Sequence, residues 1–178
     1  MNALKRIIFV LLSMIGIQTI QAEIITYPSG VTPGSWLCFR KEISVEKNAS
    51  HNLLKIAADS KYWLWINGEL VVREGGLKRG PNPKDTYCDI LQNVKGFVAG
   101  KNTVTILVWY FGKEGFSHRN SPTAGVSIDM TIGKQQYESD DSWKVCVHPS
   151  FYIPEGIKPN LSLIHISEPT RRSYISYA

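Results

Sequence analysis

Hydrophobic and polar residues alternate along much of the chain with the period of two that is typical of β-strands. The alternating or apolar runs are SWLCFRKEISV (35–45), NLLKIAA (52–58), KYWLWI (61–66), TVTILVWYF (103–111), VSIDMTI (126–132) and SWKVCVH (142–148), with a shorter run in TYCDIL (86–91). Turn-forming residues separate these runs at intervals of about ten residues, and no segment reads convincingly as a helix. We therefore predict an all-β fold, an antiparallel β-sandwich or jelly roll.

A hairpin is the most specific local feature of this pattern. Asn67 and Gly68 stand between two apolar runs, and an Asn-Gly pair favours a two-residue turn because both residues must take positive φ. We expect residues 62–66 to form one strand and residues 70–72 its antiparallel return.

Two of the predicted strands are apolar on both faces. Within 61–66 and 103–111, the second apolar face carries Trp63, Trp65, Leu107, Trp109 and Phe111. The outer face of a lone two-layer sandwich meets water, so a soluble monomer normally hides a patch of this kind. Three explanations remain open: another domain covers it, a loop of this domain covers it, or it is an open platform on which sugar rings stack.

The first 22 residues have the layout of a secretory signal peptide. Lys5 and Arg6 precede the apolar run 7–17, and Ala22 stands at a plausible cleavage point. The alternative is a buried N-terminal helix, but the run has no capping residues and is too short to span a membrane. We expect an exported protein, periplasmic or extracellular, that begins near Glu23 and is not membrane-bound after signal cleavage.

Residues 161–178 break the pattern of the preceding chain. Their first eleven residues resemble one reading frame of a transposase-type sequencing-library adapter, and 175–178 resemble the start of the flow-cell oligonucleotide that follows it. We expect this segment to be a non-native tail, so that the native sequence stops near Asn160 and the natural protein continues beyond it. The alternative is a genuine disordered tail.

The net charge changes once the two end segments are set aside. The whole chain has 20 basic and 15 acidic residues, and four of the basic residues and one acidic residue lie in those segments. Residues 23–160 therefore carry a net charge of only about +2, which does not indicate a nucleic-acid-binding surface.

Few residues have the spacing of a catalytic or metal site. The three cysteines are widely spaced without a CxxC motif, so we expect buried free thiols, although one disulfide remains possible in an exported protein. The histidines have no metal-binding spacing, and we expect no metal or other cofactor. The adjacent pair Asp140-Asp141 reads as a solvated turn, and Asp85 with Asp89 flanks the start of a strand.

Four stretches carry a resemblance to a known family. IAADSKYWLWINGELV, EGGLKRGPNPKDTYCD, GKNTVTILVWYFGKEGFSH and DSWKVCVHP together resemble the N-terminal β-sandwich of secreted bacterial α-L-rhamnosidases, the family-78 glycoside hydrolases. The resemblance covers most of residues 36–149 and implies a jelly roll of the galactose-binding-like kind. The hairpin and GKNT also occur in other glycosidases, whereas GGLKRGPNPKDTY and ILVWYFGKEGFSH are more specific. Cys88 departs from the pattern, because a second aromatic residue is expected after Tyr87.

The resemblance implies a division of labour within a longer polypeptide. In that family an (α/α)₆ barrel, further along the chain, hydrolyses the glycoside with inversion, using one carboxylic acid and one base. Residues 23–160 would then be a non-catalytic accessory domain, inactive without the barrel, which is its main expected partner. The alternative is a freestanding carbohydrate-binding module, and a rhamnose-containing glycan is a second candidate partner.

The candidate contact residues combine aromatic faces with polar loop side chains. Ring faces stack on sugars while polar groups bond their hydroxyls, and either kind of residue could instead pack against the missing barrel. Plain solvent-facing loops are the third interpretation. The candidates are Trp63, Trp65, Trp109, Lys78, Arg79, Asn82, Asp85, Lys113 and His118.

Overall fold

A computed structural model describes residues 22–47, 49, 51–77, 88–115, 120 and 123–151, and these residues form nine β-strands. The strands are β1 (Trp36–Val45), β2 (Asn52–Asp59), β3 (Lys61–Ile66), β4 (Glu69–Gly76), β5 (Asp89–Gln92), β6 (Gly100–Trp109), β7 (Gly125–Ile132), β8 (Gln135–Glu138) and β9 (Lys144–Val147). The described ranges contain no helix, and accordingly none there is long and apolar enough to cross a membrane. The predicted signal peptide up to Gln21 and the predicted non-native tail lie outside the described residues.

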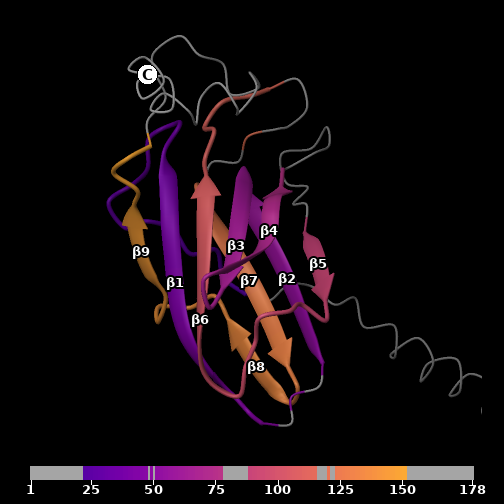
Figure 1. Ribbon diagram of the computed structural model, residues 1–178. Coiled ribbons are helices and arrows are strands. Elements are labelled where there is room, and N and C mark those ends of the chain that lie inside the picture. Colours follow the sequence, from indigo (N-terminus) through magenta and orange to yellow (C-terminus); the bar gives the residue numbers. More distant parts are fainter. Residues whose placement is uncertain are drawn as a thin grey trace, which may run out of the picture.

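Two antiparallel sheets face each other, which confirms the predicted β-sandwich (Figure 1). The five-stranded sheet has the order β4-β3-β6-β1-β9, and the four-stranded sheet has the order β5-β2-β7-β8. In Figure 1, β9 lies at the left edge of the first sheet, beside β1.

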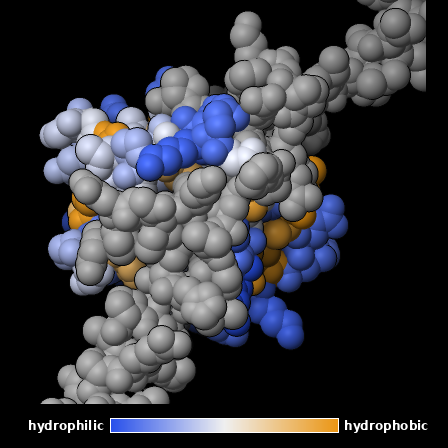
Figure 2. All heavy atoms as spheres, turned by 90° about the horizontal axis from the view of Figure 1, so that it is seen from above, coloured by the Kyte–Doolittle hydropathy of each residue, from blue (hydrophilic) through white to orange (hydrophobic). Residues whose placement is uncertain are grey.

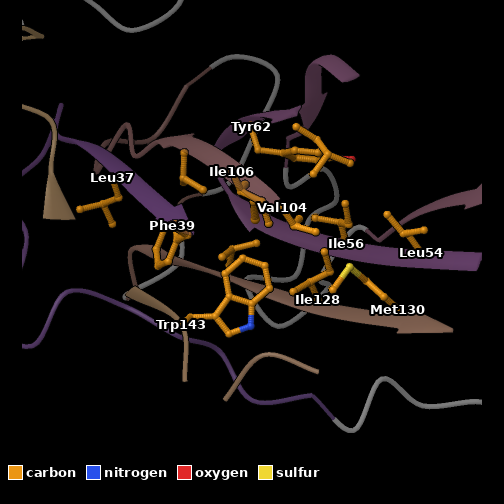
Figure 3. Close-up of a cluster of buried hydrophobic side chains, with 14 of the residues drawn as sticks. Leu37, Phe39, Leu54, Ile56, Tyr62, Val104, Ile106, Ile128, Met130 and Trp143 are labelled. Atoms are coloured by element: carbon orange, nitrogen blue, oxygen red, sulfur yellow. The ribbon is translucent and has the colours of Figure 1, made fainter. Parts of the chain in front are cut away.

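The core lies between the sheets and uses the inward half of each alternating pattern. Leu37 and Phe39 from β1, Leu64 from β3 and Ile106 from β6 meet the side chains of Ile56 and Ile128 in a single cluster. Figure 3 shows residues of both sheets pointing toward one another in this cluster, with Trp143 beside Phe39. All of these side chains are buried, so this one interface explains the inward apolar residues of β1, β2, β3, β6 and β7.

The predicted hairpin is confirmed. β3 and β4 pair antiparallel around Asn67 and Gly68, whose φ values are 52° and 84°. Positive φ at both positions is the conformation that this turn requires. The Asn67 side chain also donates to the Gly96 carbonyl, so the turn is held against the connector that precedes β6.

Several strands differ from the prediction, and β4 spans Glu69–Gly76 instead of only residues 70–72. β8 was not predicted, because its sequence QQYE is polar; it is held by pairing with β7 at the sheet edge. β6 starts at Gly100, in residues predicted as a turn, because the long neighbouring strand β1 pairs with it as far as Val45. β5 begins at Asp89, so Cys88 of the predicted run is not in the strand, and residues 86–87 of that run lie outside the described residues.

Candidate functional site

The outer face of the five-stranded sheet carries most of the predicted contact residues that the structure describes. Strand register sets its rows: Trp63 of β3 lies opposite Leu107 of β6, and Leu107 lies opposite Cys38 of β1. In the next outward-facing row, Lys61 of β3 and Trp36 of β1 lie on either side of Trp109 of β6. The second apolar face predicted for β3 and β6 is therefore one continuous surface.

An aromatic cluster occupies one end of this face, and we define it as Trp36, Trp63, Trp109, Phe111 and Phe151. The Trp36 ring stacks on Trp109 with centroids 4.9 Å apart and on Trp63 at 5.2 Å. Phe151 stacks on Trp36 at 4.5 Å, and Phe111 meets Trp109 edge-on at 4.4 Å. Rings at these separations attract one another beyond their simple burial.

The burial of this cluster selects one of the three explanations for the second apolar face, at least for the end of the sheet where the cluster lies. Trp109 has no exposed surface and Trp36 is 5% exposed, and both are packed against residues of this chain. A ring without exposed surface cannot stack directly on a sugar, so Trp109 supports its neighbours rather than contacting a ligand. The explanation in which a segment of this domain covers the patch therefore holds at this end. The indole Nε1 of Trp109 has no hydrogen-bond acceptor among the described residues.

The rest of the face remains partly open. Trp63 and Trp65 are half-buried, and Leu70, opposite Trp65 in β4, is 46% exposed. Seen from above, the described surface is mostly hydrophilic, with hydrophobic residues gathered in one larger patch and in smaller spots (Figure 2). The two tryptophans of β3 thus keep ring surface that a partner or ligand can still bury.

The polar candidates are placed unevenly. Lys113 is exposed on the loop after β6, beyond the aromatic cluster. Lys78, Arg79, Asn82, Asp85 and His118 lie outside the described residues. Their predicted role beside the aromatic face therefore stays a prediction.

In each predicted acidic pair, a described carboxylate forms hydrogen bonds that hold the fold together. Asp89 accepts hydrogen bonds from the Tyr62 hydroxyl at 2.9 Å and from the Gly76 amide at 2.8 Å, which joins the two sheets. Asp140 accepts from the amide and side chain of Ser142 and from the Lys41 ammonium at 3.0 Å, as expected for a turn. Although partial burial opposes the change, the hydrogen bonds from Ser142 and Lys41 lower the pKa of Asp140.

Three members of the aromatic cluster were missed as site residues by the sequence reasoning: Phe111, which was predicted only to lie on the outer face, and Trp36 and Phe151. Trp36 and Phe151 come from opposite ends of the domain, and nothing in their local sequence links them. The signal available was an aromatic residue at the start of β1 and another four residues after β9, but only the pairing of β1 with both β6 and β9 brings the two together.

Possible metal ligands are also scattered. Within the described ranges, no group of three or more histidine, cysteine, aspartate or glutamate residues is close enough to hold a metal ion. The three cysteines are free thiols. Cys146 is exposed, so the expectation of buried thiols was wrong for it, and Cys38 and Cys88 are only half-buried. Cys146 is exposed because it points outward from an edge strand.

Solved structures of rhamnosidases are similar to this chain. A family-78 rhamnosidase from Bacillus sp. GL1 matches 71% of the chain with a TM-score of 0.61 and 25% identity. The α-L-rhamnosidase of Aspergillus terreus matches 72% at 0.57 and 23% identity, and that of Streptomyces avermitilis, solved with L-rhamnose, matches 79% at 0.54 and 20%. No family model and no curated protein sequence matches the chain.

These matches confirm the resemblance predicted from the sequence. They cover only 13% of the Bacillus and Streptomyces chains and 17% of the Aspergillus chain. The chain therefore corresponds in fold to one β-sandwich domain within much longer glycoside hydrolases.

Proposed function

We propose that the chain is the exported, non-catalytic N-terminal accessory domain of an α-L-rhamnosidase-like glycoside hydrolase. One observation carries the proposal: a family-78 rhamnosidase matches 71% of this chain at 25% identity, yet the match spans 13% of that enzyme. The domain supports an (α/α)₆ catalytic barrel on the same polypeptide and shapes the approach of rhamnosides to it.

The open part of the outer sheet face is the surface proposed to contact that barrel. Trp63 and Trp65 keep exposed ring surface, and Leu70 extends the apolar strip onto β4. Each additional square ångström of apolar surface that a covering domain buries contributes about 25 cal/mol, so a strip of this kind favours docking. A covering domain would remove the rest of these tryptophan side chains from water, which supports contact with protein.

Hydrolysis itself is assigned to the barrel. An inverting mechanism needs two carboxyl groups about 6.5–9.5 Å apart across a cleft, with one protonating the leaving oxygen and the other activating water. Asp89 and Asp140 hold strands and turns in place instead. We therefore expect the purified chain to hydrolyse no aryl α-L-rhamnoside, and turnover that survives further purification would contradict this assignment.

The decisive test is to extend the source DNA past the codon for Asn160. A reading frame that continues for several hundred residues of helical sequence supports the accessory-domain proposal. A stop codon within a few residues of Asn160 contradicts it. Once the full gene is in hand, removal of the sandwich from the enzyme is expected to lower its melting temperature and solubility.

A freestanding carbohydrate-binding module is the second candidate, favoured by the same half-open tryptophans. It predicts that the chain binds rhamnose-bearing glycans and that Trp63→Ala or Trp65→Ala weakens binding about tenfold, the loss of roughly 1.4 kcal/mol of stacking. Tyr137→Ala on β8 is a matched control, because this half-buried ring lies on the other sheet. Equal binding by all variants, or no binding at millimolar glycan, contradicts the module.

A further inference from the structure

Cys38 and Cys146 lie directly opposite one another on neighbouring antiparallel strands. Cys38 is the third residue of β1, and Cys146 is the third residue of the edge strand β9. From this register we infer that the two thiols form a cross-strand disulfide when the chain meets a disulfide oxidant, and that the bond fastens β9 to the sheet.

Both side chains point to the same face. The neighbours of Cys38 in β1, Leu37 and Phe39, have no exposed surface and lie in the core, so Cys38 points outward. Val145 of β9 packs against the same core, so its neighbour Cys146 also points outward and is exposed. Alternation of side chains along both strands therefore places the two sulfur atoms on the outer face.

The backbone spacing suits a disulfide. The His148 amide donates to the Trp36 carbonyl at 2.7 Å, which makes that pair a hydrogen-bonded pair of the ladder. Cys38 and Cys146 lie two residues along each strand and are therefore of the same type, with Cα atoms about 5.5 Å apart. Disulfides span Cα distances of about 4.4–6.8 Å, most often near 5.5–6 Å.

The Cβ atoms must move slightly closer for the bond to form. Opposite Cβ atoms of a hydrogen-bonded pair lie near the upper end of about 4.5–5.5 Å, whereas a disulfide needs about 3.5–4.5 Å. β9 can make this adjustment, because it is only four residues long and, among the described strands, pairs only with β1. We therefore expect a bond with some strain, which mild reductant opens readily.

The environment of Cys38 already reflects its neighbour. Burial first, and then the charge and hydrogen-bonding interaction with Cys146, raise the pKa of Cys38 to about 11. Charged or titratable groups on the same face are Arg40 and Lys144 in one adjoining row and His148 in the other. Leu107, on the β6 side, brings no charge.

The chemistry is thiol–disulfide exchange with an external disulfide, such as oxidised glutathione or a thiol oxidoreductase. The exposed Cys146 thiolate attacks the oxidant, forming a mixed disulfide and releasing one thiol of the oxidant. The Cys38 thiolate then attacks the Cys146 sulfur and expels the second thiol. Two protein thiols lose two electrons and two protons, and the oxidant disulfide gains both as two thiols.

The third cysteine is separated from this pair. Cys88 precedes β5 in the other sheet, and its sulfur contacts the Asp89 carbonyl at 3.6 Å. It should remain a thiol, which resolves the odd cysteine count that left the connectivity open in the sequence.

The bond would also hold the covering segment of the aromatic cluster. β9 leads within four residues to Phe151, whose ring stacks on Trp36. Fastening β9 to β1 therefore keeps the end of the described domain against the sheet. This consequence does not require the proposed function, because it depends only on strand register.

The test uses the full chain, purified reduced and then exposed to oxidised glutathione at pH 8. We expect free thiols to fall from three to one per chain, and peptide mass spectrometry to find one cross-link, between Cys38 and Cys146. The melting temperature should rise by an amount on the order of 5 °C and return on reduction. A persistent glutathione adduct on Cys146 beside a free Cys38 thiol would overturn the inference.

Two controls make the result specific. Cys88→Ser should form the same bond at the same rate, whereas Cys38→Ser should stop at the glutathione adduct of Cys146. In concentrated urea, where strand register is lost, the wild-type chain should give a mixture of all three pairings. The same mixture from the folded chain, or cross-links between chains, would show that register does not select this pair.

Discussion

Trp36→Ala tests whether the aromatic cluster is built by this domain itself. The Trp36 ring is 5% exposed and stacks on Trp109, Trp63 and Phe151 at centroid distances of 4.9, 5.2 and 4.5 Å. Truncating a buried tryptophan to alanine costs about 3–5 kcal/mol, from lost burial and the cavity left behind. This is a large part of the roughly 5–15 kcal/mol that stabilises a domain of this size.

Urea denaturation of the full chain, followed by circular dichroism, measures the effect. With a slope of about 2 kcal/mol per molar urea, Trp36→Ala should lower the midpoint by about 2 M. Trp65→Ala is the matched control, because its ring is half-buried outside the cluster and should cost about 1–1.5 kcal/mol, or less than 1 M.

Comparing the urea midpoints of the two variants tests whether this domain itself covers the aromatic cluster. Equal or reversed shifts would mean that Trp36 is not packed in the isolated chain, and that the whole outer face awaits a partner. The larger loss for Trp36→Ala would show that only the strip around Trp63 and Trp65 is left for the barrel or a glycan.

Three further predictions concern single polar groups. Tyr62→Phe removes the bond from the buried hydroxyl to Asp89 and should cost about 1–3 kcal/mol in urea denaturation. Asp140→Asn should lower the melting temperature at pH 6 but not near pH 2. The native pKa of Asp140 is lowered, so its contribution is complete above about pH 4 and is lost as pH falls through the native value. Closure of the Cys38–Cys146 bond should accelerate from pH 7 to pH 9, because the raised pKa of Cys38 keeps its thiolate scarce at neutral pH.

Each of these predictions has a control. Tyr137→Phe removes an exposed bond to the Ser44 carbonyl and should cost less than Tyr62→Phe; an equal cost would contradict the role given to burial. A melting difference for Asp140→Asn that is independent of pH would show that charge is not the cause. For the thiols, stopped-flow measurement of closure after rapid formation of the Cys146 adduct isolates the second step, and a rate independent of pH would contradict the explanation.

The local pattern of the sequence was enough to predict several features of the fold. Alternation in 36–45 and 126–132 predicts strands within a residue of β1 and β7, because a two-residue period can bury only one face of an extended chain. Asn67-Gly68 specifies its own turn, since the required positive φ is a property of those residues. The resemblance to family-78 rhamnosidases was likewise carried by short stretches and is confirmed by similar structures.

Only the tertiary structure decided what the outward residues of these strands do. The alternation of side chains along a strand predicts that Trp63 and Trp109 point away from the core, but it does not predict which neighbours cover them. Trp109 is buried because β1 places Trp36 beside it, whereas Trp63 stays half-open. The pairing of Cys38 with Cys146 and the polar strand β8 depend in the same way on partner strands distant in sequence. Register between distant strands is set by packing of the whole core, and no local pattern of residues encodes it.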